Sequence, residues 1–250
     1  MKSIVSPNEK INAESWFPGR WIGGLSLVLG PILLLAGELL RVKYHFYYPD
    51  QLAAFKEQPT LMAASYGLFA AGIIVMWPGI LALVRLIGAK KPGWALWGGI
   101  LAIMGLFARM YHAGVDNLAY WLVQFQGLEL ATTFISESYA YNYQGFYVIA
   151  TILFSGMIGW FVLAIGAFRS RTLNLPYSIA LGLMGIHSLG VLKGTSWDTL
   201  VAVIGLCVAL TPLGIKILQD GPTPSLSVAM KWFIVIVIIG GIFFFVGQNA

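Results

Sequence analysis

The sequence predicts an all-α integral membrane protein, a bundle of seven transmembrane helices. Three observations support this fold class. Of the 250 residues, 58% are hydrophobic and only 10% are charged, whereas soluble domains usually carry about 25% charged residues. The apolar residues gather in stretches of roughly 20, the length that crosses the hydrocarbon core of a bilayer. No long polar insertion separates these stretches, so we expect a single membrane domain.

The apolar stretches define the spans in order. A polar segment, residues 1–20, comes first and is expected in the cytoplasm or at the membrane interface. The first apolar stretch is too long for the apolar region of a cleavable signal peptide, so it is expected to remain as an anchor. The membrane domain covers residues 21–247, with spans at about 21–42, 61–84, 94–122, 146–168, 176–195, 198–217 and 231–247.

The basic residues of the loops predict the orientation. Lys and Arg concentrate on the cytoplasmic side of membrane proteins. With the N-terminus inside and the C-terminus outside, ten basic residues lie inside and four outside, which favours this N-in/C-out topology in a bacterial-type plasma (inner) membrane. Because they mark helix ends, the net charge of +5 predicts no nucleic-acid partner. The ten are Lys2, Lys10, Arg20, Arg85, Lys90, Lys91, Arg169, Arg171, Lys216 and Lys231, and the four are Arg41, Lys43, Lys56 and Lys193.

A weak internal repeat runs through the chain. Segments 77–85, 159–169 and 211–216 each close an even-numbered span and lead through a basic loop into the next helix. Two interpretations remain open. The pattern is that of three duplicated hairpins after a first helix, or it is the ordinary composition of a helix end that faces the cytoplasm.

Two predicted extracellular connections, residues 43–60 and 123–145, are longer than turns. The first is expected to hold a short surface helix that starts after Pro49 and ends before Pro59. The second contains no Lys or Arg from 126 to 145 and ends in an aromatic run that includes Tyr143. It is either an interfacial segment with an aromatic belt or a lid over the helices.

Four polar residues of the third span share one helical face. Arg109, His112, Asp116 and Tyr120 are spaced 3, 4 and 4 apart, which aligns them on a helix. At about 1.5 Å of rise per residue, Arg109 lies roughly 10 Å below the outer surface. An ionisable group at that depth is costly and needs a partner. Glu38 of the first span is the natural candidate.

Two glycines lie on that same side of the third span. Gly98 and Gly105 are small enough to let a neighbouring helix approach closely. We therefore expect the polar face to lie inside the bundle.

Further polar groups of the other spans lie at a similar depth. Glu38, Arg41 and His45 share a face of the first span, and His187 lies in the fifth. Five inner stretches of the spans carry no ionisable residues, which argues against ion- or proton-coupled transport. They are residues 22–31, 74–84, 94–104, 159–168 and 233–240. We predict a polar cup that opens outward, built from the first, third and fifth helices and covered by residues 126–145. A purely structural network of salt bridges is the alternative.

A metal site is the first chemistry that the cup offers. His112 and Asp116 lie four residues apart and His187 supplies a second nitrogen. These three are candidate ligands for a divalent metal such as zinc, which would activate water in a hydrolase. A haem between the two histidines is a further alternative.

Acid–base chemistry without a metal is the second chemistry that the cup offers. His112, Asp116 and Glu38 are the candidate catalytic residues, because a carboxyl group in an apolar cavity can act as a general acid. Aromatic side chains would stabilise a cation. That combination suits a lipid or isoprenoid substrate.

Binding of a ligand without catalysis is the third possible function of the cup. Arg109, Arg41, His187, Tyr120 and Tyr143 would then hold a small amphipathic or lipid-like ligand, and the leading hypothesis is that such a ligand binds in the cup. Whether the protein is an enzyme stays open. The alternative is a receptor, immunity protein or accessory subunit with a peptide or protein partner.

Overall fold

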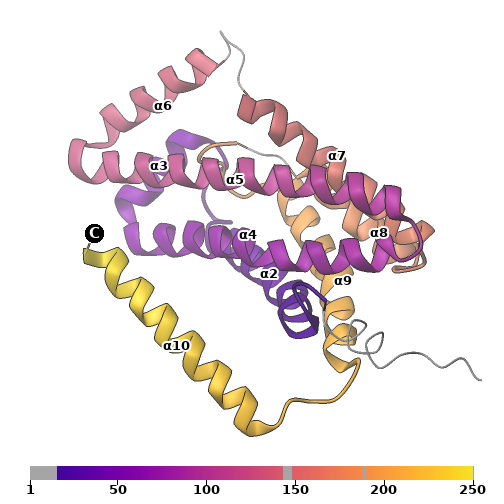
Figure 1. Ribbon diagram of the computed structural model, residues 1–250. Coiled ribbons are helices and arrows are strands. Elements are labelled where there is room, and N and C mark those ends of the chain that lie inside the picture. Colours follow the sequence, from indigo (N-terminus) through magenta and orange to yellow (C-terminus); the bar gives the residue numbers. More distant parts are fainter. Residues whose placement is uncertain (1–15, 143–147, 188–189, 250) are drawn as a thin grey trace, which may run out of the picture. The chain divides into compact units, whose positions relative to one another are not determined.

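The computed structural model describes residues 16–142, 148–187 and 190–249, and every regular element in these ranges is a helix. The chain divides into two compact units, Met1–Leu218 and Gln219–Ala250. The first contains the helices up to α9 and the second contains α10 (Figure 1).

Six helices in the described ranges are long and apolar enough to cross a membrane. This confirms the all-α membrane class, whereas the orientation and the repeat stay predictions. Five of the six fall within a few residues of predicted spans in the first unit, and α10 matches the last predicted span. The six are α2 (Arg20–Leu40), α4 (Pro59–Gly88), α5 (Pro92–Gln126), α7 (Val148–Arg169), α9 (Trp197–Gln219) and α10 (Leu226–Asn249).

The seventh predicted span, residues 176–195, is not one long helix, so the count of seven is not confirmed. Helix α8 (Leu175–Gly182) continues as the 3₁₀ turn η1 (Leu183–Ile186), and residues 190–196 are not helical. The two together rise about 20 Å, short of the roughly 30 Å of hydrocarbon. Glycine, a poor helix former, recurs where the helix weakens, at Gly185, Gly190 and Gly194.

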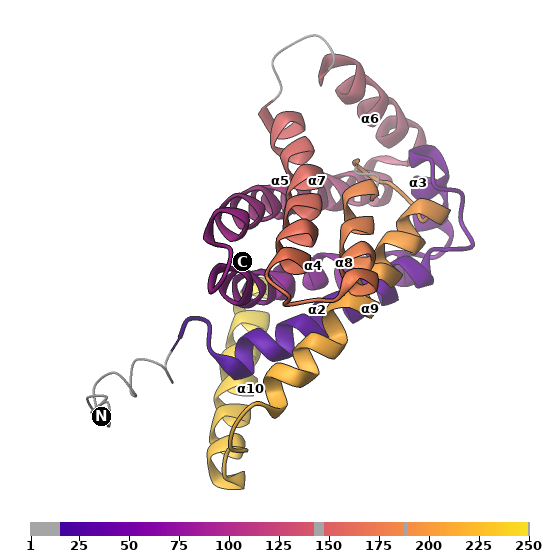
Figure 2. The ribbon, with the colours of Figure 1, turned by 90° about the vertical axis from the view of Figure 1, so that its right-hand side faces the viewer.

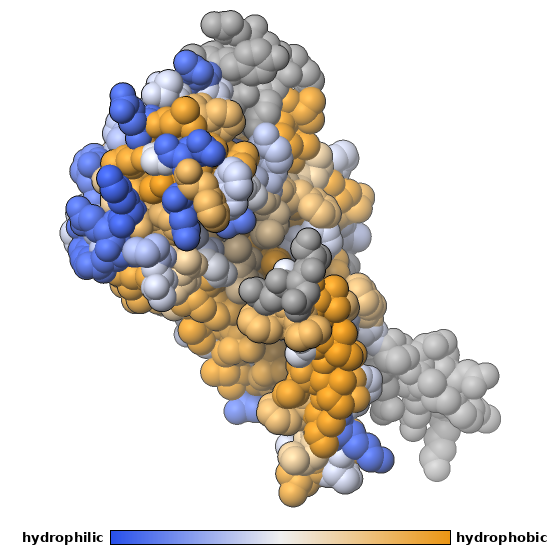
Figure 3. Space-filling model, turned by 90° about the vertical axis from the view of Figure 1, so that its left-hand side faces the viewer, coloured by the Kyte–Doolittle hydropathy of each residue, from blue (hydrophilic) through white to orange (hydrophobic). Residues whose placement is uncertain are grey.

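Helix α5 is the longest helix and carries a polar end. Its 35 residues measure about 52 Å, more than a bilayer core needs. The surplus packs with α3 (Tyr48–Glu57) and α6 (Leu128–Asn142) at what we call the α3 end. Helix α3 has a proline in its first turn and ends at Glu57, which confirms the predicted short helix, whereas its place at the membrane surface stays a prediction. On the face drawn in Figure 3, hydrophilic side chains gather at this end.

Close contacts between small residues set the spacing of α5 and α7. A Cβ added to Gly105 would lie 2.4 Å from the Cα of Gly156, and one added to Gly98 would lie 2.9 Å from the Leu163 nitrogen. Neither position accepts a larger residue without moving the partner helix. The predicted role of both glycines is confirmed.

The other helices of the first unit complete its core. Helix α2 packs along α4, and Gly214 of α9 lies against the Gly24 carbonyl of α2. In Figure 2, α8 and α9 lie side by side, in agreement with the contact between Gly205 and the Ala180 carbonyl. Helix α8 and η1 are helical, whereas residues 190–196, which lead to Trp197, are irregular chain.

Helix α10 forms the second unit. Apart from Ser227 and Lys231, its side chains from Leu226 to Val246 are apolar or glycine, and the large apolar ones are exposed. A helix that is hydrophobic all round is typical of a membrane span.

Candidate functional site

Polar side chains at the C-terminal end of α2 form a network with Ser65 and Thr195, which we call the Glu38 cluster. Arg41 is fully buried and forms an ion pair with Glu38 Oε1, three residues earlier in the chain. The Thr195 hydroxyl lies 2.6 Å from Oε2 of the same carboxylate. Arg41 Nη1 also donates to Ser65 Oγ, at 3.2 Å. Both Glu38 oxygens therefore have donors inside the protein.

This pairing corrects the sequence-based expectation for Glu38. We expected it to pair with Arg109 of α5, but its ion pair is with Arg41. Residues three apart are neighbours on a helix surface, so the pair forms at the C-terminal end of α2, where Arg41 is the capping residue. The predicted catalytic role of Glu38 and the predicted ligand-binding role of Arg41 remain untested, and their side chains lie in this cluster.

Arg109 and Asp116 of α5 hold the irregular chain that follows η1. Arg109 Nη1 donates to the Gly190 carbonyl, and Asp116 Oδ1 accepts from the Leu192 N–H. Leu192 has a φ of 49°, a conformation that a branched side chain rarely adopts. Non-helical backbone at membrane depth is tolerated where protein groups satisfy it. These two side chains supply such groups.

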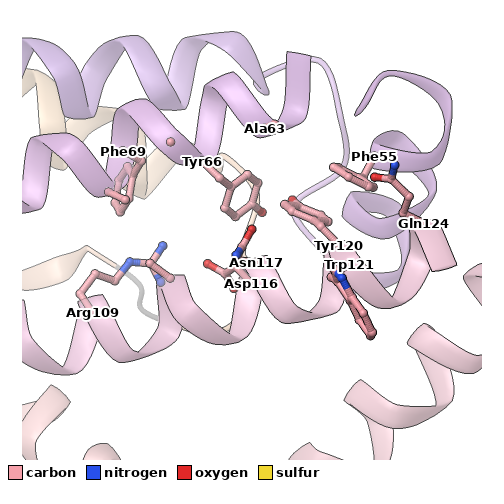
Figure 4. Close-up of a pocket in the computed structure, with 13 residues that line it drawn as sticks. Phe55, Ala63, Tyr66, Phe69, Arg109, Asp116, Asn117, Tyr120, Trp121 and Gln124 are labelled. Carbon is pink, nitrogen blue, oxygen red and sulfur yellow. The ribbon is translucent and has the colours of Figure 1, made fainter. Parts of the chain in front are cut away.

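The same two side chains line a cavity of about 430 Å³ between α4 and α5. Figure 4 shows Arg109 at one end of this α4–α5 cavity and Trp121 at the other, with Asp116 between them. Tyr66 of α4 projects toward Asp116 and Tyr120. Arg109 and Asp116 therefore sit along one wall of the cavity. Each of these two side chains uses only part of its hydrogen-bonding capacity on the chain at 190–192.

Aromatic side chains form most of the remaining wall. Phe55 of α3 stacks on Tyr120, with ring centroids 4.2 Å apart, and Tyr66 meets the same ring edge-on at 5.1 Å. The Arg109 guanidinium lies 4.8 Å from the centre of the Phe69 ring, a cation–π contact. The cavity is thus apolar with a few placed polar groups, as ligand pockets usually are.

Small residues leave the cavity open on the α4 side. Ala63, Gly67 and Ala70 line it, and their spacing of 4 and 3 places them on one helical face. Among the described residues, no atom outside the glycine's chain neighbours and the adjacent backbone of α4 lies within 4 Å of the position that a Cβ on Gly67 would take. Trp121 of α5 is 52% exposed beside the opening. The opening lies between two helices long enough to span the membrane.

The structure brings together only part of the predicted cup. Arg109, Asp116 and Tyr120 line the cavity, whereas His112 and His187 do not. Tyr143 lies outside the described residues. The walls come from α3, α4 and α5, so the third span, now α5, is the one predicted helix of the cup that contributes. No described residue of the proposed lid, now helix α6, is among those that line the cavity.

Several lining residues were missed from the sequence. Tyr66 and Gly67 belong to a span without a deep charge, so no ionisable group marked them. The regular spacing of small residues around Gly67 was the available signal. Asn117 and Trp121 each follow a predicted residue by one position, so they lie at the edge of the polar face.

The predicted metal ligands do not gather. In the ranges that the structure describes, no three His, Cys, Asp or Glu residues lie together as a group that could hold a metal ion. His187 instead packs against Phe69, with ring centroids 6.1 Å apart. Metal binding by His112, Asp116 and His187 stays a prediction that the described residues do not test.

Comparison with protein-family models, with curated proteins and with solved structures finds no match for this chain. Its class therefore follows from its own helices. Six apolar helices of spanning length are those of a multi-pass membrane protein.

Proposed function

We propose that this protein binds a small amphipathic or lipid-like ligand in the α4–α5 cavity. The observation that supports this is the cavity itself: about 430 Å³ of space, walled by aromatic rings, with Arg109 and Asp116 along one side. An apolar pocket with a few convergent polar groups is the usual form of a small-molecule site. The ligand's apolar part would lie against Phe55 and Tyr120.

The opening suggests how the ligand enters. It lies between α4 and α5 beside Gly67, so a molecule dissolved in the bilayer would reach it sideways. In the predicted N-in/C-out orientation in the plasma membrane, the α3 end faces outward. The ligand would then come from the outer leaflet.

Binding, rather than catalysis, is the function that the lining residues favour. Of the three predicted catalytic residues, Asp116 alone lines the cavity. The described residues that line the cavity include one carboxylate and no histidine or second acid, whereas acid–base enzymes use paired groups. Asp116 is the residue through which such chemistry would act.

Filling the cavity tests the proposal. Gly67→Leu would place a side chain in the opening, and Gly114→Leu is the matched control, because both glycines are helical with nothing within 4 Å of the added Cβ. Gly114 does not line the cavity. Each change removes a glycine from a helix interior, worth about 1 kcal/mol in helix propensity, so the two variants have comparable backbone effects.

The measurement is native mass spectrometry of the three detergent-purified proteins. We expect the wild type and Gly114→Leu to retain the same small molecule and Gly67→Leu to lose it. Equal retention in all three would place the ligand elsewhere and contradict the proposal. A wild type that is purified empty would favour the alternative function, an accessory or immunity protein with a protein partner.

A further inference from the structure

A small chamber of about 30 Å³ lies beside the α4–α5 cavity. Arg109 and Phe69 line both spaces, so they form the boundary between them. The rest of the chamber wall is largely apolar and comes from α2, α4, α5, α7 and η1, with Leu34, Ile73 and Met184 among its residues. The chamber therefore extends the proposed site toward the centre of the bundle.

His187 lines this chamber with both ring nitrogens unsatisfied. The side chain is 2% exposed, and neither Nδ1 nor Nε2 has a hydrogen-bond partner in the part of the chain that the structure describes. Buried polar groups almost always have partners. A space of this size holds a water molecule or a small polar group. The imidazole thus indicates that something polar occupies the chamber.

The charges around the chamber indicate the sign of that group. Arg109 supplies a permanent positive charge, and His187 and Trp160 each carry a ring N–H donor. None of the described residues that line the chamber is an Asp or Glu. Asp116 lines the larger cavity and not the chamber. Several donors with one positive charge and no carboxylate favour an anion.

We propose that the ligand is an amphipathic monocarboxylate, whose carboxylate lies in the chamber between Arg109 and His187 and whose apolar chain lies in the α4–α5 cavity. The inference rests on the proposed function, because it concerns the same site. It adds the charge of the ligand and makes His187 a specificity-determining residue. The chamber is small, so a carboxylate fits it better than a bulkier anionic head group. The chain would leave past Phe69 through the opening beside Gly67.

Three probes of equal chain length test the charge. Dodecanoate, dodecanol and dodecyltrimethylammonium are titrated separately into the full-length protein in a neutral detergent, and one-to-one complexes are measured by native mass spectrometry. Hydrogen bonds to an ionised acceptor are roughly twice as strong as neutral ones. We therefore expect dodecanoate to bind about tenfold tighter than dodecanol, and the cation to bind most weakly.

One variant tests the role of His187. His187→Phe keeps an aromatic ring against Phe69 and removes both nitrogens. We expect dodecanoate to bind about tenfold more weakly, with a smaller loss for dodecanol, whose hydroxyl makes only a neutral hydrogen bond. A merely structural histidine would leave both affinities alone, and the melting temperature of the empty variant should not fall, because an unsatisfied polar group has been removed. Gly114→Leu serves as the control and should bind all three probes as the wild type does.

The outcomes separate this inference from the proposed function. Equal binding of dodecanoate and dodecanol, with both lost in Gly67→Leu, would overturn the carboxylate and leave the amphipathic site standing. An unchanged dodecanoate affinity in His187→Phe would overturn the role of His187. Failure of every probe, together with a wild type that retains no molecule on purification, would contradict both. The comparison among probes uses the wild type alone, so it holds even where a variant fails to fold.

Discussion

The Glu38 cluster and the α4–α5 cavity both hold buried charges beside the irregular chain at 190–196, but they differ in what those charges face. Both carboxylate oxygens of Glu38 have donors within the protein. Arg109 and Asp116 each bind one backbone group and also border an open space. Depth alone therefore does not identify a functional charge in a membrane protein. The space beside the charge and the partners it already has are the better criterion.

The largest effect should come from breaking the ion pair of the Glu38 cluster. Glu38→Leu leaves the Arg41 guanidinium buried without its carboxylate, which typically destabilises a protein by about 3–5 kcal/mol. The free energy of unfolding in mixed detergent–SDS micelles measures this. The double variant Glu38→Leu/Arg41→Leu should recover part of the loss, since no charge is then left unpaired. A single variant within about 1 kcal/mol of the wild type would show that the cluster is not structural.

An intermediate effect is expected at Asp116. Asp116→Leu leaves the buried Leu192 N–H without its acceptor, at a cost of about 1–3 kcal/mol, whereas Asp116→Asn keeps an acceptor of the same shape. Hydrogen exchange at the Leu192 amide should be much faster in the leucine variant and close to that of the wild type in the asparagine variant. Equal exchange in all three proteins would mean that Asp116 does not hold the irregular chain. Lining the cavity would then be its remaining role.

The smallest effect is expected at an exposed pair of side chains near the α3 end. His45 Nδ1 lies 3.0 Å from Asp50 Oδ2, but the two side chains are 62% and 54% exposed. Exposed ion pairs contribute about 0–1 kcal/mol. Asp50→Asn should therefore change the free energy of unfolding by less than about 1 kcal/mol, and any change should shrink further in high salt. A loss as large as that of Glu38→Leu would show that exposure does not separate the two kinds of pair.

The helices were predictable because a bilayer demands long apolar runs. The same rule failed at 176–195, where hydropathy cannot distinguish a continuous helix from a helix followed by apolar irregular chain. Hydropathy counts Gly190 and Leu192 as membrane residues, and they do lie in the bundle. Their backbone is satisfied by α5 side chains more than 70 positions earlier. Such pairings are set by tertiary packing, and the sequence carries no local sign of them.

The candidate site was predictable on one side. Helical spacing aligned Arg109, Asp116 and Tyr120, and all three line the cavity. The opposite wall was not foreseen, because Tyr66 and Gly67 carry no charge and their contribution is an aromatic ring and a missing side chain. The pairing of Glu38 with Arg41 was predictable from the sequence, since Arg41 lies one helical turn away.

The irregular chain at 190–196 has a consequence for biosynthesis. Bare backbone groups in hydrocarbon cost several kcal/mol each, so this stretch cannot enter the lipid alone as an apolar helix does. The side chains that receive it, Glu38, Arg109 and Asp116, belong to helices that the ribosome makes earlier. Its binding partners are therefore already in place when it emerges, and for this stretch insertion into the membrane and folding are one event.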